Sequence, residues 1–259
     1  MADATRRLEE ARELLAGGGP AVVLTGAGIS ADSGVPTFRG EDGLWKEHRP
    51  EELATPSAFR RDPRLVWEWY GWRREVVAGC EPNEAHRALA RWTHRSPGVW
   101  ILTQNVDALH VRALEEAAGD GPSPRERLLE LHGSLFRVRC TGCGRRRHHR
   151  DPIDASSRET LPRCSDCGSL LRPDVVWFGE ALDPDVLERA RRAAERAQTC
   201  LVVGTSGAVE PAASLARIAA GGGAAVVEVD PDRTALSGLA DVAVRAGAAG
   251  AVPALLEPS

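Results

Sequence analysis

The sequence predicts an α/β protein with a doubly wound parallel sheet and a smaller zinc-binding and helical insertion. Three observations lead to this fold class. A short apolar run at residues 21–25 leads directly into a glycine-rich turn, as a buried parallel strand does. From residue 183 onward, helix and strand patterns alternate. Between these two parts, two Cys-x-x-Cys pairs mark a small metal-binding module.

Length and composition limit the classes of protein to consider. A chain of 259 residues suits one large domain with a smaller insertion. The net charge of −4 argues against a dedicated nucleic-acid binder. No apolar run reaches the roughly 18 residues that a membrane span needs, and the charged N-terminus lacks a signal-peptide core. We therefore expect a cytoplasmic protein that does not contact a membrane.

The first predicted elements are an amphipathic helix at residues 5–15 and the strand at residues 21–25. The turn after this strand matches the G-x-G-x-x-A spacing at Gly26, Gly28 and Ala31, which indicates a Rossmann-type phosphate site. A simple turn is the alternative, because Gly-Ala-Gly often follows a strand without binding anything. The acidic residue that usually follows about 20 residues later is missing. Residues 32–40 are instead predicted to form a loop that could cover a dinucleotide.

The remaining elements follow in order along the chain. Residues 50–94 are predicted to be helical and are rich in tryptophan, and residues 99–103 form a second buried strand. Later predicted strands or extended segments are 128–132, 135–139, 175–178, 200–203, 224–229 and 242–244, with helices at 183–197 and from Pro211. We expect a Rossmann-type domain of residues 1–40, 95–137 and 171–259, a helical part of the small domain at 41–94, and a zinc module at 138–170.

The four cysteines of the paired motif are the strongest single signal. Cys140 and Cys143 precede Cys164 and Cys167 at a spacing typical of a four-thiolate zinc site. Two redox dithiols or a pair of disulfides are the alternative, which a cytosolic chain disfavours. Four sulfur ligands leave no open coordination position, so we expect one structural Zn²⁺. The histidines between the pairs are not needed as ligands.

Polar residues follow the ends of several predicted strands. Because the carboxyl ends of parallel strands meet at one edge of the sheet, residues 26–30, 104–107, 204–206 and 228–230 should share one crevice. Asp107 could equally be a helix cap. His132 lies beside a glycine near this crevice; it is either structural or a general base.

Taken together, the motifs resemble those of the sirtuins, which are NAD-dependent protein-lysine deacylases. The shared motifs are Gly-Ala-Gly-Ile-Ser, Gly-Val-Pro-Thr-Phe-Arg, Thr-Gln-Asn-Val-Asp, Leu-His-Gly, the paired Cys-x-x-Cys, Val-Trp-Phe-Gly-Glu and Gly-Thr-Ser. They cover the chain from Val22 to about Ala248. The resemblance implies that NAD and an acyl-lysine protein or peptide meet between two domains. The products would be lysine, nicotinamide and 2′-O-acyl-ADP-ribose.

The resemblance also implies roles for particular residues. His132 would be the general base. NAD would contact Gly26, Ala27, Gly28, Ser30, Phe38, Arg39, Trp45, Gln104, Asn105, Val106, Asp107, Gly204, Thr205, Ser206, Asp230, Pro231, Asp232 and Ala248. The substrate would contact Tyr70, Arg73, Val176, Phe178, Gly179, Glu180 and Val209.

Two departures from the common sirtuin pattern affect these expectations. Thr37 stands where many sirtuins have Asp, and in this it resembles the class III (deacetylase/desuccinylase) subgroup. Members of that subgroup also carry a tyrosine and an arginine three residues apart, which are Tyr70 and Arg73 in this chain. This implies removal of succinyl and malonyl groups as well as acetyl groups. Asp230 stands where many sirtuins have Asn, so it can accept hydrogen bonds from a ribose but cannot donate as an amide does.

Other functions remain open from the sequence. A dehydrogenase or an ADP-ribosyltransferase could use the same Rossmann-type core with NAD. A zinc-ribbon protein could use residues 140–167, with Arg145–Arg147, to bind nucleic acid or a partner protein. That third function would have no need of His132 or of the polar residues 104–107.

Overall fold

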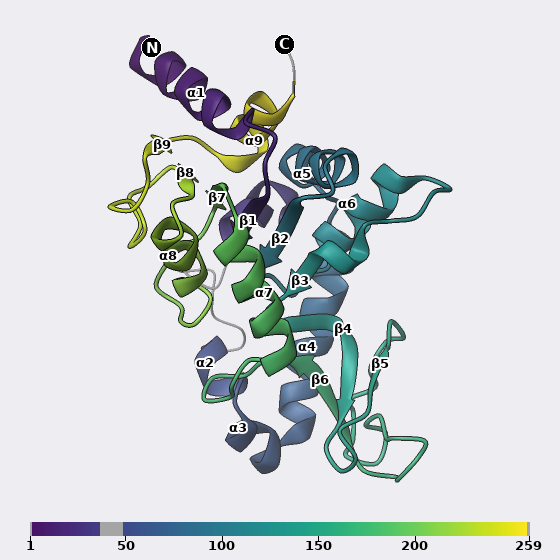
Figure 1. The fold of residues 1–259 in the computed structure, drawn as a ribbon. Coiled ribbons are helices and arrows are strands. Elements are labelled where there is room, and N and C mark those ends of the chain that lie inside the picture. Colours follow the sequence, from purple (N-terminus) through teal and green to yellow (C-terminus); the bar gives the residue numbers. More distant parts are fainter. Residues whose placement is uncertain (1, 37–48, 258–259) are drawn as a thin grey trace.

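The main element of the protein is a six-stranded sheet in which every strand is parallel, seen in a computed structural model that describes residues 2–36 and 49–257 (Figure 1). The strand order is β3-β2-β1-β7-β8-β9. The strands β2 and β3 follow β1 outward on one side, and β7, β8 and β9 follow on the other, so the order of the chain through the sheet switches between β1 and β7. A crevice at the carboxyl ends of the strands is expected at such a switch. The strands are β1 Ala21–Thr25, β2 Val99–Thr103, β3 Leu128–Glu130, β7 Thr199–Val203, β8 Ala225–Val229 and β9 Val242–Val244.

Helices cover both faces of this sheet, which confirms the predicted doubly wound fold. Val23 of β1 packs into the core on one face, and Val22 and Leu24 pack into the core on the other. Strands buried on both sides read as continuous apolar runs, which is why β1 and β2 could be predicted from sequence. One face carries α1 Ala2–Leu15, α5 Glu84–Arg95, α6 Leu109–Ala118 and α9 Ala248–Leu256; the other carries α7 Pro184–Arg196 and α8 Ser214–Gly221.

A second unit, which we call the small module, lies at the opposite end of the molecule from α1 and α9 (Figure 1). It contains an antiparallel sheet in the order β5-β4-β6 and three helices. Thr55 and Asp62 cap two of these helices through the amides of Ala58 and Leu65, at 3.1 and 3.0 Å. The elements are β4 Gly133–Cys140, β5 Arg146–His148, β6 Leu171–Val175, α2 Pro50–Leu53, α3 Pro56–Arg61 and α4 Pro63–Ala78.

The packing divides the chain differently from the predicted boundaries at two places. Helix α5 was expected in the small domain, but Ala85, Ala88 and Leu89 pack into the core of the large sheet. Most of β4 and all of β6 lie in segments that were expected in the Rossmann-type domain, yet the two strands pair with each other in the small sheet. A helical period reveals an apolar face but not the core against which that face packs.

Two segments differ in detail from the expectations. Of residues 175–178, predicted as a strand or an extended segment, only Val175 belongs to a strand, β6, and the rest follow it outside any strand. The start of β6 was missed because Pro173 and two charged residues conceal it; Pro173 is tolerated because β6 is an edge strand. Part of the loop expected after β1 forms a 3₁₀-helix, η1 Ala27–Ser33, which ends at Gly34 with a φ of 81°. A second short 3₁₀-helix, η3 Arg125–Arg127, precedes β3. Among the described residues, no helix is both long and apolar enough to cross a membrane.

Candidate active site

Two glycine loops, one after β1 and one after β7, interlock at the crevice. The Gly26 amide donates to Val203 O at 3.1 Å, and the Gly28 amide donates to Gly204 O at 2.8 Å. A Cβ added to Gly28 would lie 2.7 Å from the Gly204 Cα, and Gly204 has a φ of 58°. The glycines are therefore needed first for the approach of the two loops. The amide of Gly28 itself is occupied within the protein.

The loop after β2 joins this pair of glycine loops through side chains. Gln104 Nε2 donates to Thr205 Oγ1 at 2.8 Å. Asn105 Nδ2 donates to Ser30 Oγ at 3.0 Å, and Ser30 Oγ lies 2.8 Å from Asp107 Oδ2. Three segments predicted to share one crevice are thus in direct contact. We call residues 26–30, 104–107 and 204–206, together with His132, the cofactor crevice.

Asp107 makes contacts with both of its oxygen atoms. Its Oδ1 accepts from the Leu109 amide at 2.9 Å, which caps the start of α6, while its Oδ2 faces Ser30 in the crevice. Burial raises the pKa of Asp107, and the amide of Leu109 and the hydroxyl of Ser30 oppose that shift. Val106, between the two crevice residues Asn105 and Asp107, turns the other way and packs into the core of the small module.

His132 has the geometry of a general base. Its Nδ1 lies 3.0 Å from Gln104 O, which can only accept, so Nδ1 carries the proton and Nε2 keeps a lone pair. Among the described residues, no hydrogen-bond partner occupies Nε2. Burial lowers the pKa of His132, with the bond to Gln104 opposing it, so the ring is neutral at pH 7. A neutral imidazole with one free nitrogen can accept a proton from a bound hydroxyl.

The segment after β6 connects His132 to the surface expected to bind substrate. The Val176 amide donates to His132 O at 2.9 Å, and the Phe178 amide donates to Ala54 O at 2.9 Å. The Phe178 side chain is 55 % exposed, and Val209 in the loop after β7 is 40 % exposed. Gly179 has a φ of 84° and is exposed beside them. No hydrogen bond between described residues joins residues 176–180 to the Val209 loop.

The Glu180 carboxylate makes contacts within the protein. It accepts two hydrogen bonds from Arg172, at 2.5 and 2.9 Å, and one from the Trp177 amide at 3.0 Å. These donors outweigh burial and lower the pKa of Glu180. The carboxylate therefore stabilises the loop internally.

Tyr70 and Arg73 share one side of α4, as their spacing predicted. The Arg73 Cζ lies 5.7 Å from the centre of the Tyr70 ring and 4.9 Å from that of Trp69. Burial lowers the pKa of Arg73, and the charge of Asp107 is among the influences that oppose the shift. The cation thus lies within electrostatic range of the cofactor crevice. Tyr70 itself is 1 % exposed and packs in the core of the small module.

The expected adenosine end of the site lies after β8. The Gly204 amide donates to Val229 O at 3.0 Å, which brings Asp230 next to the second glycine loop. Asp230 Oδ1 accepts from the Asp232 amide at 3.0 Å, and burial raises the pKa of Asp230. Pro231 and Asp232 are exposed, Ser206 is half-buried, and Ala248 is buried at the start of α9.

Thr37 and three expected cofactor contacts, Phe38, Arg39 and Trp45, lie outside the described residues.

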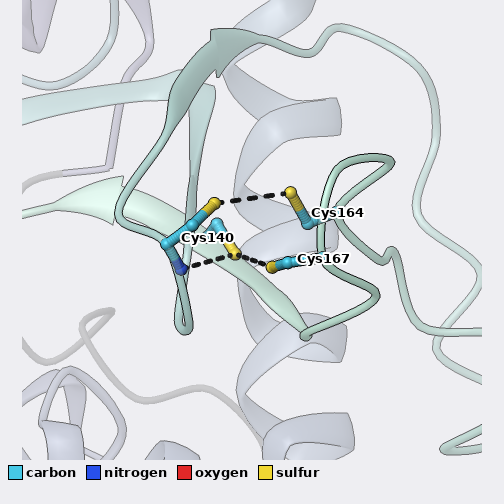
Figure 2. Close-up of side chains that lie close together, drawn as sticks. Cys140, Cys164 and Cys167 are labelled. Atoms are coloured by element: carbon cyan, nitrogen blue, oxygen red, sulfur yellow. Dashed lines mark hydrogen bonds between the residues drawn. The ribbon is translucent and has the colours of Figure 1, made fainter.

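The four cysteine thiols converge as predicted (Figure 2). All four sulfur atoms lie within 4.8 Å of one another; Cys140 and Cys167 are 3.4 Å apart, and Cys143 and Cys164 are 3.7 Å apart. Four Zn–S bonds of about 2.3 Å place sulfur atoms about 3.8 Å apart, so this cluster fits a tetrahedral zinc ion. The described residues add no histidine to it, which agrees with a closed structural site.

Arg145–Arg147, between the two Cys-x-x-Cys pairs, make contacts within the protein. Arg145 pairs with Asp166 at 3.0 Å, and Arg146 pairs with Asp183 at 2.5 Å. Arg147 donates to a backbone carbonyl at 3.3 Å.

Sequence reasoning missed two buried histidines behind the crevice. His110 Nε2 lies 3.0 Å from Thr25 Oγ1, and His86 Nε2 lies 3.4 Å from Ser30 Oγ. Burial lowers the pKa of both, that of His110 to about 3. The available signal was weak, because each histidine lies on the apolar face of a helix and only tertiary contact reveals its polar partner.

The chain is similar to proteins of one known family. A model of the "Sir2 family" matches residues 26–211. The "NAD-dependent protein deacylase 1" of Archaeoglobus fulgidus is 50 % identical over 231 residues, which are 89 % of each chain. The "NAD-dependent protein deacylase" of Aquifex aeolicus is 49 % identical over 222 residues, which are 85 % of this chain and 87 % of the relative.

Solved structures are similar over almost the whole chain. A Sir2 homologue in complex with NAD has a TM-score of 0.86 and 47 % identity, and covers 96 % of this chain and 92 % of its own. A mutant Sir2 homologue with 2′-O-acetyl ADP ribose has a TM-score of 0.85, 46 % identity and coverage of 96 % and 94 %. A Sir2 protein with a p53 peptide and NAD⁺ has a TM-score of 0.82, 30 % identity and coverage of 96 % and 97 %.

Proposed function

Because this chain belongs to the Sir2 family, we propose that it is an NAD-dependent deacylase of lysine side chains in proteins or peptides. The observation that carries the proposal is His132, with its free Nε2 beside the loop of Gln104–Asp107 and the two glycine loops. The names of the relatives give the same activity. We place the protein in the cytoplasm.

The cofactor crevice fits NAD by the chemistry of its donors. The two glycine loops lie close together, which brings the polar groups of three segments to one place. Gln104, Asn105 and Thr205 offer amide and hydroxyl groups to ribose and carboxamide oxygens, and Asp230 offers a carboxylate to a ribose hydroxyl. When bound, NAD supplies the ribose carbon that takes the acyl oxygen as nicotinamide leaves.

His132 would move one proton in this reaction. Its Nδ1–H bond to Gln104 O fixes the ring, and Nε2 would accept the proton of a ribose hydroxyl. The neighbouring amide of Val176 donates to His132 O, so the base and the substrate-binding segment would keep a constant relative position. Residues 176–180 and Val209 would pair with the extended backbone of the substrate.

We further propose that the enzyme removes succinyl and malonyl groups as well as acetyl groups. A guanidinium can bind a terminal carboxylate in a bidentate way, and a phenol can donate one more hydrogen bond. Arg73 and Tyr70 provide these two groups on one side of α4. Hydrogen bonds to charged groups contribute roughly 1.5–3 kcal/mol each, enough for a tenfold preference.

The test is incubation with NAD and matched acetyl-, succinyl- and malonyl-lysine peptides, followed by mass spectrometry. We expect free lysine peptide, nicotinamide and 2′-O-acyl-ADP-ribose in equal amounts. Formation of NADH would instead identify a dehydrogenase, and ADP-ribose attached to the peptide would identify an ADP-ribosyltransferase.

The variant Arg73→Met tests the acyl preference. We expect desuccinylation to fall at least tenfold more than deacetylation, because only the succinyl group carries the charge that Arg73 would bind. Equal losses on both substrates would mean that Arg73 supports the fold and does not select the acyl group.

A further inference from the structure

The hydrogen bond between Trp177 and Tyr70 has only one possible direction. The indole Nε1 lies 2.9 Å from the phenol oxygen, and an indole nitrogen can only donate. The phenol oxygen must therefore accept this bond, which leaves the phenol's own proton for another acceptor. Among the described residues, Trp177 is the phenol's hydrogen-bond partner. Both side chains are almost fully buried, at 1 % and 2 % exposed.

Trp177 is in turn fixed by Arg172 of β6. The Arg172 Cζ lies 3.3 Å from the centre of the indole ring, a stacked cation–π contact. Its guanidinium also donates to Val175 O at 2.8 Å and twice to the Glu180 carboxylate. Because Glu180 also accepts from the Trp177 amide, one ion pair fixes both the backbone and the ring of Trp177.

We propose that Arg172 and Trp177 are positioning residues for acyl selectivity, which fix the Tyr70 phenol as a hydrogen-bond donor to the acyl carboxylate beside Arg73. This inference rests on the proposed function. A hydroxyl that accepts one hydrogen bond becomes a stronger donor in the next, because the two bonds polarise each other. The stacked guanidinium and the indole would thereby favour a negatively charged acyl group over a neutral one.

A spectroscopic experiment tests the contact without any measurement of activity. Tyr70 is the only tyrosine in the chain, so the ultraviolet absorbance of tyrosinate reports on this one phenol. Burial raises the pKa of Tyr70, and the hydrogen bond from Trp177 and the charge of Arg172 oppose that shift. In Trp177→Phe, which keeps an aromatic ring but lacks the N–H, the phenol should titrate at higher pH than in the wild type.

The matched control is Trp67→Phe. Trp67 is an equally buried tryptophan, but its Nε1 donates to Leu171 O at 2.9 Å and not to Tyr70. The control should leave the titration of the phenol at its wild-type position. Equal shifts in the two variants, or no shift in Trp177→Phe, would overturn the inference.

A kinetic experiment tests the consequence for substrates. We expect Trp177→Phe and Arg172→Leu to lower kcat/KM for succinyl-lysine peptide about tenfold more than for acetyl-lysine peptide, the effect of one weakened charge-assisted hydrogen bond. In a Tyr70→Phe background, Trp177→Phe should cause no further loss of selectivity. Additive losses would overturn the inference, because Trp177 would then act independently of the phenol.

Failure of this inference differs from failure of the proposed function. A wild-type protein that removes acetyl groups but not succinyl groups overturns the inference and leaves deacetylation intact. A wild-type protein that releases no nicotinamide with any acyl-lysine peptide overturns the proposed function.

Discussion

The cofactor crevice and the small module are stabilised by different kinds of interaction. In the crevice, backbone bonds such as Gly28 N–H to Gly204 O at 2.8 Å act together with bonds between short polar side chains. In the small module, long side chains connect distant segments. Arg74 of α4 donates to the carbonyls of His149 and Asp151, and Arg146 bridges Asp174 and Asp183. The contacts of the crevice thus come from short motifs of glycine and small polar residues, whereas those of the small module come from long charged side chains and from a metal site.

The largest effect we expect is from removal of zinc, which should affect the two regions unequally. Structural zinc contributes about 10–16 kcal/mol in small zinc-binding peptides, and the sulfur cluster joins the β4 end to the turn before β6. Chelation, or Cys143→Ser, should increase amide hydrogen exchange in residues 138–170 before exchange changes in β1, β2 and β7. Mass spectrometry of exchanged peptides measures this order.

Cys80→Ser is the control for the zinc experiment, because Cys80 lies outside the cluster. This variant should retain one zinc per chain. An apo protein with unchanged thermal stability would contradict a structural role for the metal.

The variant His132→Ala should produce the next largest effect, now in the crevice. We expect deacylation to fall roughly 10²–10⁴-fold, the usual contribution of a general base. The fold and NAD binding should remain, since the side chain of His132 makes one hydrogen bond among the described residues, to a backbone carbonyl, and the backbone bond from the Val176 amide is kept in the variant. Steady-state kinetics, with calorimetry for NAD, measures both effects.

His148→Ala is the control for that experiment, because His148 is an exposed histidine of the small module. Near-normal turnover in a folded His132→Ala protein would exclude the proposed role of His132.

The contacts of the crevice could be predicted from the sequence better than those of the small module. Ser30, Gln104 and Asp107 lie in the segments that follow β1 and β2, two strands that read as apolar runs, so their meeting at one edge of the sheet could be foreseen. The partners of Tyr70 could not, because Trp177 lies 107 residues away on a segment with no regular pattern. Contacts between side chains from different elements leave no periodic signal in either element.

The pH dependence of stability should reflect the buried histidines of the crevice. The pKa of His110 is lowered by burial from 6.5 to about 3. Between these two pH values the unfolded chain binds more protons at this position than the folded chain. The free energy of unfolding should therefore fall as the pH is lowered from 7, by about 2 kcal/mol at pH 5 from this residue.

Denaturant unfolding of His110→Gln checks this expectation. The variant should lose less stability than the wild type between pH 7 and pH 5, whereas His94→Gln, at an exposed helix position, should follow the wild type. Parallel pH profiles for all three proteins would mean that burial of His110 does not contribute to acid sensitivity.

The smallest expected effect concerns backbone strain at the start of α6. Ala108 is the one described non-glycine residue with a positive φ, at 61°, a conformation that costs an alanine about 1–2 kcal/mol. The strain places Asp107 so that it both caps α6 and faces Ser30. Ala108→Gly should remove this strain, which stabilises the folded protein. The greater conformational freedom of glycine in the unfolded chain should lower the stability by roughly 0.4–1 kcal/mol and so offset part of that effect. We therefore expect the free energy of unfolding to rise by up to about 1 kcal/mol.

The control variant is Ala117→Gly, within α6, which should instead lower the free energy of unfolding by roughly 0.5–1 kcal/mol. Destabilisation by both variants would mean that the αL conformation at residue 108 is not strained.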